Sequence, residues 1–326
     1  MTPRTDDPPE LKFASEVLSN ERWTPTPLLP ATVIGSRLGC DLWLKREDCT
    51  PIGSFKLRGG LVAMARMADS LPSKGVYVAS AGNYGLAIAV AGQRRGVPVT
   101  VVVPEGATPS KLERIRLSGG HVVVHGSDFD IAKDFARNEA ARDGAAFWED
   151  GVIEETAHGA ATIGAEITDH SEPWDWVVVP LGNGSLIKGI ASVIKARSPG
   201  TTVIAAVPSG TPAMALALRG KSWDESAPVE TLADGLAVRV PIMPVVAELK
   251  ELVDDVWLVD ESRLLPAVKS LLELEQVVAE PSAAISIAGL ADHRAEAAGR
   301  RVAAVVTGAH LSASLVAQVA TMDGLL

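Results

Sequence analysis

The sequence predicts an α/β protein with two open, twisted sheets that carry helices on both faces. Short valine-rich runs alternate with helical stretches of about 10–15 residues, which is typical of βαβ units. Apolar residues make up 47% of the 326 residues but aromatic residues only 4%, and small or β-branched side chains suit helices packed closely on parallel strands. At about 100–200 residues per domain, this length predicts about two domains.

The expected elements follow the chain in a regular order. Prolines at positions 25, 27 and 30 predict an irregular arm over 1–30, followed by a strand at 41–45 and a helix at 55–68. The first block has expected strands at 76–80, 99–103, 121–125 and 145–148, with helices at 84–95, 109–118 and 128–142. The second block has expected strands at 176–180, 203–207, 256–259 and 302–306, and its helices begin near 186, 212, 261, 282 and after the last strand. Loops are expected at 220–230 and 239–244.

Composition excludes several classes of partner. The net charge is −10 and no basic block is present, which argues against nucleic acid. No apolar run approaches the roughly 20 residues that cross a bilayer, and the polar N-terminus lacks the pattern of a secretory signal. Cys40 and Cys49 are expected to be reduced thiols. We therefore expect a cytoplasmic protein with neither a nucleic-acid nor a membrane partner.

The usual metal and nucleophile motifs are absent. The sequence contains no Cys-x-x-Cys, no His-Glu-x-x-His, no phosphate-binding loop of the Gly-x-x-x-x-Gly-Lys type and no Gly-x-Ser-x-Gly. His121 and His125 share one face of an expected strand, where polar strand ends are a better interpretation than metal ligands. We expect no metal site.

Three junctions between a strand and a helix could carry chemistry. Lys56 is expected in the first turn of a helix, where the helix dipole disfavours the charged amine and favours a Schiff-base nucleophile, although a solvated surface lysine would look the same. The segment from Ser80 to Gly85 could present backbone N–H groups to a carboxylate, or be an ordinary junction capped by Asn83. The glycine-rich segment 182–186 could approach a phosphate closely. Each signal is weak alone, but together they suit pyridoxal phosphate chemistry on an amino acid.

The motifs at these junctions resemble those of the tryptophan-synthase β-family, the fold type II pyridoxal phosphate enzymes. The similarity is greatest to serine/threonine dehydratases, with threonine synthase and cysteine synthase as relatives. The most specific motifs are Lys45-Arg-Glu-Asp and Gly53-Ser-Phe-Lys-Leu-Arg-Gly. Ser80-Ala-Gly-Asn, Gly182-Asn-Gly-Ser, Ala233-Asp-Gly, Glu280-Pro-Ser and Thr307-Gly follow in the order of the family.

The resemblance implies a set of site residues and two domains. It implies that Lys56 holds pyridoxal 5′-phosphate as a Schiff base and acts as the general base. The other implied cofactor-binding residues are Phe55, Asn83, Gly182, Asn183, Gly184, Ser185, Leu186, Gly235, Glu280 and Thr307. The implied substrate-binding residues are Ser80, Ala81, Gly82, Asn83 and Tyr84. A large cofactor-binding domain would comprise 1–58 and 155–326, and 59–154 would form a small, mobile domain.

The implied function is a lyase that eliminates the β-hydroxyl of a serine- or threonine-like amino acid, giving a 2-oxo acid and ammonia. A hydroxyl at Thr307 beside the pyridine nitrogen would favour elimination over racemisation. The alternative is a β- or γ-replacement synthase similar to threonine synthase or cysteine synthase. The resemblance also implies a homodimer.

Several positions depart from the family pattern and leave the substrate open. Tyr84 stands where the family often has His, Ile52 where it often has Thr, and His310 where it often has Asn. Serine racemases of the family have a Ser at the position of Ala81, so we expect no efficient racemase. The same relatives ligate a divalent cation with a Glu where Val207 stands, so we expect no cation there.

Overall fold

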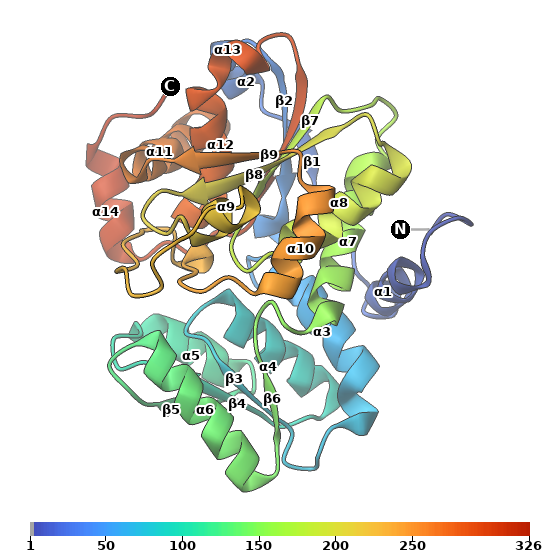
Figure 1. Ribbon diagram of the computed structural model, residues 1–326, viewed down its shortest axis with the longest axis vertical. Helices are drawn as coiled ribbons and strands as arrows, with labels where there is room; N and C mark the ends of the chain where they lie inside the picture. Colours follow the sequence, from blue (N-terminus) through green and yellow to red (C-terminus); the bar gives the residue numbers. More distant parts are fainter. Residues whose placement is uncertain (1–2) are drawn as a thin grey trace. The chain divides into compact units, whose positions relative to one another are not determined.

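The computed structural model describes residues 3–326, and its contacts divide the chain into two units (Figure 1). Unit 1 consists of the residues up to Trp23 together with Lys56–Gly159. Unit 2 consists of Thr24–Phe55 and Ala160–Leu326. Each unit contains its own sheet with flanking helices, which confirms the predicted α/β class.

Unit 1 is built on a parallel sheet of four strands in the order β5-β4-β3-β6. The strands are β3 (Val76–Ala79), β4 (Val99–Val103), β5 (His121–Val124) and β6 (Ala146–Trp148). The helices are α1 (Pro9–Asn20), α3 (Lys56–Met67), α4 (Asn83–Arg95), α5 (Pro109–Leu117), α6 (Phe129–Asp143) and the start of α7 (Glu154–Thr168). Because β3 and β6 are parallel neighbours, the loops that follow them leave the same edge of the sheet.

Unit 2 contains a sheet of six strands in the order β1-β2-β10-β7-β8-β9, in which only β1 is antiparallel. The strands are β1 (Leu28–Pro30), β2 (Asp41–Arg46), β7 (Trp176–Pro180), β8 (Thr202–Pro208), β9 (Asp255–Val259) and β10 (Arg301–Val306). The helices are α2 (Thr32–Leu38), α8 (Ser185–Arg197), α9 (Ala213–Leu218), α10 (Met243–Leu252), α11 (Leu264–Glu275), α12 (Pro281–Asp292), α13 (Arg294–Ala297) and α14 (Ala313–Thr321), besides the remainder of α7.

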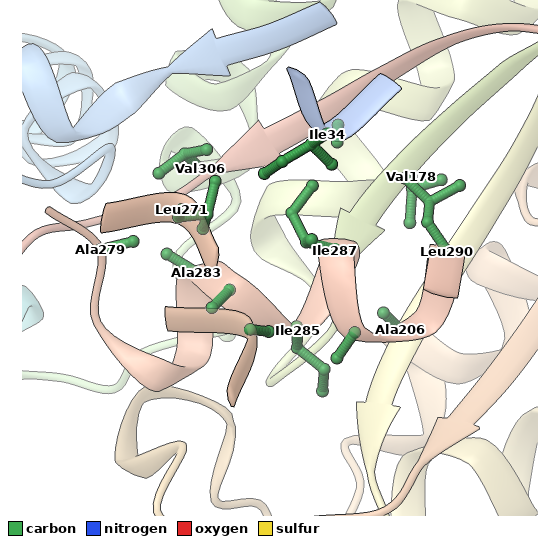
Figure 2. Close-up of a cluster of buried hydrophobic side chains, with 14 of the residues drawn as sticks. Ile34, Val178, Ala206, Leu271, Ala279, Ala283, Ile285, Ile287, Leu290 and Val306 are labelled. Carbon is green, nitrogen blue, oxygen red and sulfur yellow. The ribbon is translucent and has the colours of Figure 1, made fainter. Parts of the chain in front are cut away.

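Both faces of this second sheet are buried, as expected for parallel strands. Alternate residues of β7 point to opposite faces, so Val178 lies in one apolar cluster and Val177 in the other. Figure 2 shows the first cluster, where Val306 lies beside Leu271 of α11 and Val178 beside Leu290 of α12. Residues of α7, α8 and α10 cover the opposite face. The sheet is thereby a rigid platform for the loops at its carboxyl edge.

The predicted irregular arm over residues 1–30 is wrong, because α1 occupies Pro9–Asn20 and β1 occupies Leu28–Pro30. Pro9 stands at the first helical position, where proline is well tolerated because its missing N–H would have no helical partner. The apolar positions Leu11, Ala14 and Leu18 follow a helical spacing and are buried. Within unit 1, α1 packs on α3, and Arg66 lies over the ring of Phe13 at 3.7 Å.

The contact division also differs from the expected domain boundaries at the N-terminus. The residues up to Trp23 group with Lys56–Gly159, whereas the sequence placed them in the large domain with 155–326. Besides α1, three further helices were not predicted, namely α2, α7 and α10, and α10 begins inside the expected loop at 239–244. All the other predicted strands and helices are present within a few residues of their expected ends.

Candidate functional site

Lys56 is the first residue of α3 and lies beside the carboxylate of Asp150. The two carboxylate oxygens of Asp150 lie 2.6 and 2.7 Å from Lys56 Nζ. Asp150 belongs to the loop that follows β6, at the edge of the sheet from which the loop after β3 also leaves. Sequence reasoning placed Lys56 correctly at a helix start but missed Asp150, which follows a short strand as the other site loops do.

The substrate-loop residues predicted from Ser80 to Tyr84 connect β3 to α4. Gly82 precedes α4, and its backbone N–H donates to Ser80 Oγ at 3.2 Å. No atom lies within 4 Å of the position that a Cβ of Gly82 would occupy, so the backbone there is open to a bound group. The N-terminal N–H groups of α4 have no partners within their own helix. Together these features suit a carboxylate.

Tyr84 is buried in the first turn of α4, with 4% of its surface exposed. Its hydroxyl has no hydrogen-bond partner among the residues that the structure describes. Burial, followed by the charges of Asp150 and Glu149, raises the pKa of Tyr84 well above its ordinary value. The Tyr84 ring centroid lies 5.6 Å from Lys56 Nζ. The raised pKa keeps the phenol uncharged.

The second group of site residues lies in unit 2, at the carboxyl edge of β2, β10 and β7. These three strands are parallel neighbours, so the loops that follow them leave the sheet side by side. The loop after β7 contains Gly182 and Asn183 and leads into α8 at Ser185. The loop after β10 begins with Thr307, and the chain after β2 leads to Phe55.

The glycine-rich loop before α8 is built to approach an anion closely. Gly184 has φ = +101°, and a Cβ on it would lie 2.6 Å from Val245 Cγ1. Ser185 is 6% exposed and its hydroxyl has no hydrogen-bond partner among residues 3–326. An unpartnered buried hydroxyl beside the free N–H groups of a helix start is a set of donors for phosphate oxygens.

Backbone contacts join the remaining predicted residues of unit 2 to this loop. A Cβ on Gly182 would lie 3.0 Å from the carbonyl oxygen of Gly235, and Gly235 N donates to Ser282 Oγ at 3.1 Å. Glu280, two residues before Ser282, is 5% exposed. The structure therefore groups Gly182, Gly235 and Glu280 at one edge of the sheet.

Thr307 and Phe55 are held together by a short pairing between the segments 53–55 and 307–310. Phe55 N donates to Thr307 O at 3.1 Å, and Ala309 N donates to Gly53 O at 3.1 Å. Glu280 supports this pairing, because its N–H donates to Gly308 O at 3.0 Å and its carboxylate accepts from His310 N at 3.1 Å. Sequence reasoning noted His310 only as a departure from the family pattern and did not predict this support.

Among residues 3–326, no group of three or more His, Cys, Asp or Glu side chains could hold a metal ion. Val207, at the expected position of a cation ligand in some relatives, is buried in β8 with 1% of its surface exposed. No helix in the described part of the chain combines the length and apolarity needed to cross a membrane.

A family model described as pyridoxal-phosphate dependent enzyme matches residues 20–308. The chain is 32% identical over 307 residues to an L-threonine ammonia-lyase of Thermotoga maritima, covering 94% of this chain and 76% of that protein. It is 33% identical over 289 residues to a biosynthetic L-threonine dehydratase of Salmonella typhimurium, covering 88% of this chain and 56% of that protein.

Solved structures show the same similarity. The processed form of threonine deaminase isoform 2 from Solanum lycopersicum has a TM-score of 0.88 and 31% identity, with 97% of this chain and 94% of that chain covered. Maize serine racemase has a TM-score of 0.84 and 28% identity, with 94% and 95% covered. The fold that the motifs predicted is therefore the fold of these enzymes.

Proposed function

Since the chain belongs to the family of pyridoxal-phosphate-dependent enzymes, we propose that it is an ammonia-lyase acting on serine or threonine. It eliminates the β-hydroxyl and yields a 2-oxo acid and ammonia. The names of the relatives, threonine ammonia-lyase and threonine dehydratase, support this assignment. The observation that carries this assignment is a set of backbone hydrogen bonds. They join the segment 53–55, which directly precedes Lys56, to Thr307 and its loop.

The residues present fit the cofactor at its phosphate end and around its ring. The unpartnered hydroxyl of Ser185 and the left-handed Gly184 suit the phosphate. Thr307 offers a hydroxyl rather than a carboxylate to the pyridine nitrogen, as the resemblance implies. We assign Phe55, Gly235 and Glu280 to the same cofactor, and the N-terminal N–H groups of α4 to the substrate carboxylate.

When bound, the cofactor withdraws the electrons that remain on Cα after a proton leaves. The Lys56 amine removes that proton as a general base. The loop from Ser80 to Tyr84 orients the substrate through its carboxylate, because the backbone at Gly82 is open and the start of a helix favours a negative charge. The hydroxyl then departs from Cβ, and the enamine product is hydrolysed to the 2-oxo acid and ammonia.

Product analysis with single amino acids tests this function. The purified protein with pyridoxal phosphate is given serine or threonine alone, and 2-oxo acid and ammonia are measured. Both products are expected in equal amounts, and Lys56→Ala should abolish them while circular dichroism stays unchanged. Lys221→Ala, which removes an exposed lysine, is the matched control and should retain full activity. Product that forms only when a second nucleophile is supplied would favour a replacement synthase instead.

We also propose that the enzyme is a homodimer that acts in the cytoplasm. The dimer rests on the resemblance to the dehydratases. The compartment is supported by two free thiols, Cys40 and Cys49. Burial, followed by the charge of Asp41, raises the pKa of Cys40 to about 11, which keeps that thiol unreactive. Light scattering of the eluted protein should give twice the mass of one chain, and a monomer mass would contradict the dimer.

A further inference from the structure

The amine of Lys56 is held by Asp150, a carboxylate to which the proposed function gives no role. Both carboxylate oxygens contact Nζ, at 2.6 and 2.7 Å. The side chains are 15% and 23% exposed, so water screens this pair less than it would screen a surface pair. The residues are 94 positions apart in sequence, so the pair depends on the fold of unit 1 and not on local geometry.

The neighbouring carboxylate, Glu149, has different partners. Its two oxygens lie 3.3 Å from Lys133 Nζ and 3.1 Å from Arg137 Nη2, both on α6. The charge of Glu149 is therefore compensated by α6, whereas the carboxylate of Asp150 faces Lys56. Tyr84 also lies beside the amine, and it is buried and uncharged. Asp150 therefore presents its carboxylate directly to the Lys56 amine, with both oxygens in contact with Nζ.

We propose that Asp150 is the counter-charge of Lys56 in turnover, where it stabilises the ammonium ion formed when the amine takes the Cα proton. This inference rests on the proposed function. The lone pair of Nζ binds the proton, and the two electrons left on Cα form the Cα–Cβ double bond when the C–O bond then breaks. The proton then passes from Nζ to the departing oxygen, so water leaves and the amine is neutral again. The Asp150 carboxylate beside Nζ lowers the free energy of the charged amine.

The same contact has the opposite effect on cofactor loading. A neutral amine must attack the aldehyde of the cofactor, and Asp150 favours the charged amine. Loss of the carboxylate should therefore speed loading and slow turnover. A residue that only supports the fold would change both rates in the same direction, so the two measurements separate the roles.

Asp150→Asn is the test, with Glu149→Gln as the matched control. Loading is followed by absorbance after pyridoxal phosphate is added to the cofactor-free chain, with no amino acid present. We expect Asp150→Asn to load faster than the unmodified chain. Its turnover should fall by about tenfold to a hundredfold, the range that corresponds to a charged hydrogen bond. The kinetic isotope effect of Asp150→Asn, measured with Cα-protonated and Cα-deuterated substrate, should be larger than that of the unmodified chain. Glu149→Gln should match the unmodified chain in loading rate, turnover and isotope effect.

The inference is overturned if Asp150→Asn slows loading and turnover together, or if both rates equal those of Glu149→Gln. Circular dichroism reports whether the variant folds, and Asp150→Ser is a second neutral variant if it does not. Asp150→Glu retains the charge and should recover most of the turnover. If the unmodified chain has no lyase activity, the proposed function is refuted. The loading rates still test the pairing of Asp150 with Lys56, because they are measured without substrate.

Discussion

The imidazole Nε2 of His310 lies 2.8 Å from the carbonyl oxygen of Ile52, so a side chain of the loop after β10 contacts the backbone that leads to the segment 53–55. Gly53 follows with φ = +69°, and a Cβ on it would lie 3.2 Å from the same nitrogen. For this hydrogen bond to form, Nε2 must carry a proton and donate it. His310 therefore braces a left-handed turn that ends three residues before Lys56.

Replacement of His310 by Ala should loosen this turn. We expect a loss of about 1 kcal/mol in the free energy of unfolding, the usual contribution of one hydrogen bond. Cofactor affinity should fall as well, because the segment 53–55 that pairs with Thr307 becomes less ordered. Urea denaturation and titration with pyridoxal phosphate measure the two effects. His310→Gln keeps a side-chain donor and should lose less of both, and equal losses in the two variants would contradict the bracing role.

Ser185→Ala should affect the stability of the fold and the affinity for the cofactor differently. The hydroxyl is buried without a partner in the described chain, so its removal should leave the cofactor-free protein equally stable or slightly more stable. Binding of pyridoxal phosphate should weaken by about tenfold, because one donor to the phosphate is lost. Thermal unfolding with and without cofactor compares the two states. A cofactor affinity equal to that of the unmodified chain would remove Ser185 from the phosphate site.

The site residues that could be predicted from the sequence are those at strand ends. The loop from Ser80 to Tyr84 and the glycine-rich loop before α8 each follow a short apolar run, and Lys56 stands where a helix is expected to start. Each of these signals is weak alone, and their combination and the family resemblance gave them a role. The fold class follows from the same alternation of strands and helices. Each strand and helix start is encoded by residues that are neighbours in the chain, which is why these features could be predicted from the sequence.

What the sequence analysis missed depends on contacts between distant segments or on local signals that conflict. Asp150 belongs to the candidate site only because it contacts Lys56, 94 residues earlier, and no periodicity in the sequence indicates such a contact. His310 likewise acts on Ile52, 258 residues away. The helix α1 was missed because the prolines at positions 25, 27 and 30 were interpreted as signs of an irregular arm over the whole of 1–30, although all three lie beyond the end of the helix at Asn20.

Gly184→Ala tests the close approach at the start of α8. A residue with a side chain is strained at φ = +101°, and the new Cβ would lie 2.6 Å from Val245 Cγ1. Strain and overlap together should cost about 2–4 kcal/mol of stability. Gly144→Ala is the matched control, because Gly144 has φ = +67° with no atom within 4 Å, so it carries only the backbone strain. Urea denaturation should show the larger loss at Gly184, and equal losses would mean that the overlap with Val245 relaxes freely.

Tyr84→Phe tests the buried hydroxyl beside Lys56. Loss of an unpartnered buried hydroxyl should raise the free energy of unfolding at pH 7 by about 1 kcal/mol. The raised pKa of Tyr84 means that the folded chain keeps the phenol proton at a pH where the unfolded chain releases it. The stabilisation from this proton is therefore fully present below about pH 10 and is lost as the pH rises further. Above about pH 10, the free energy of unfolding of Tyr84→Phe should depend less on pH than that of the unmodified chain.

The same variant should bind substrate less well, because the loop from Ser80 to Tyr84 is assigned to the substrate carboxylate. We expect KM to rise by about tenfold, the effect of one lost hydrogen bond to a charged group, with a smaller change in kcat. If Tyr84→Phe is more stable and has a higher KM, the Tyr84 hydroxyl binds substrate and destabilises the fold. If KM is unchanged while stability rises, Tyr84 contributes only its ring, and the substrate carboxylate is held by the backbone of α4 alone.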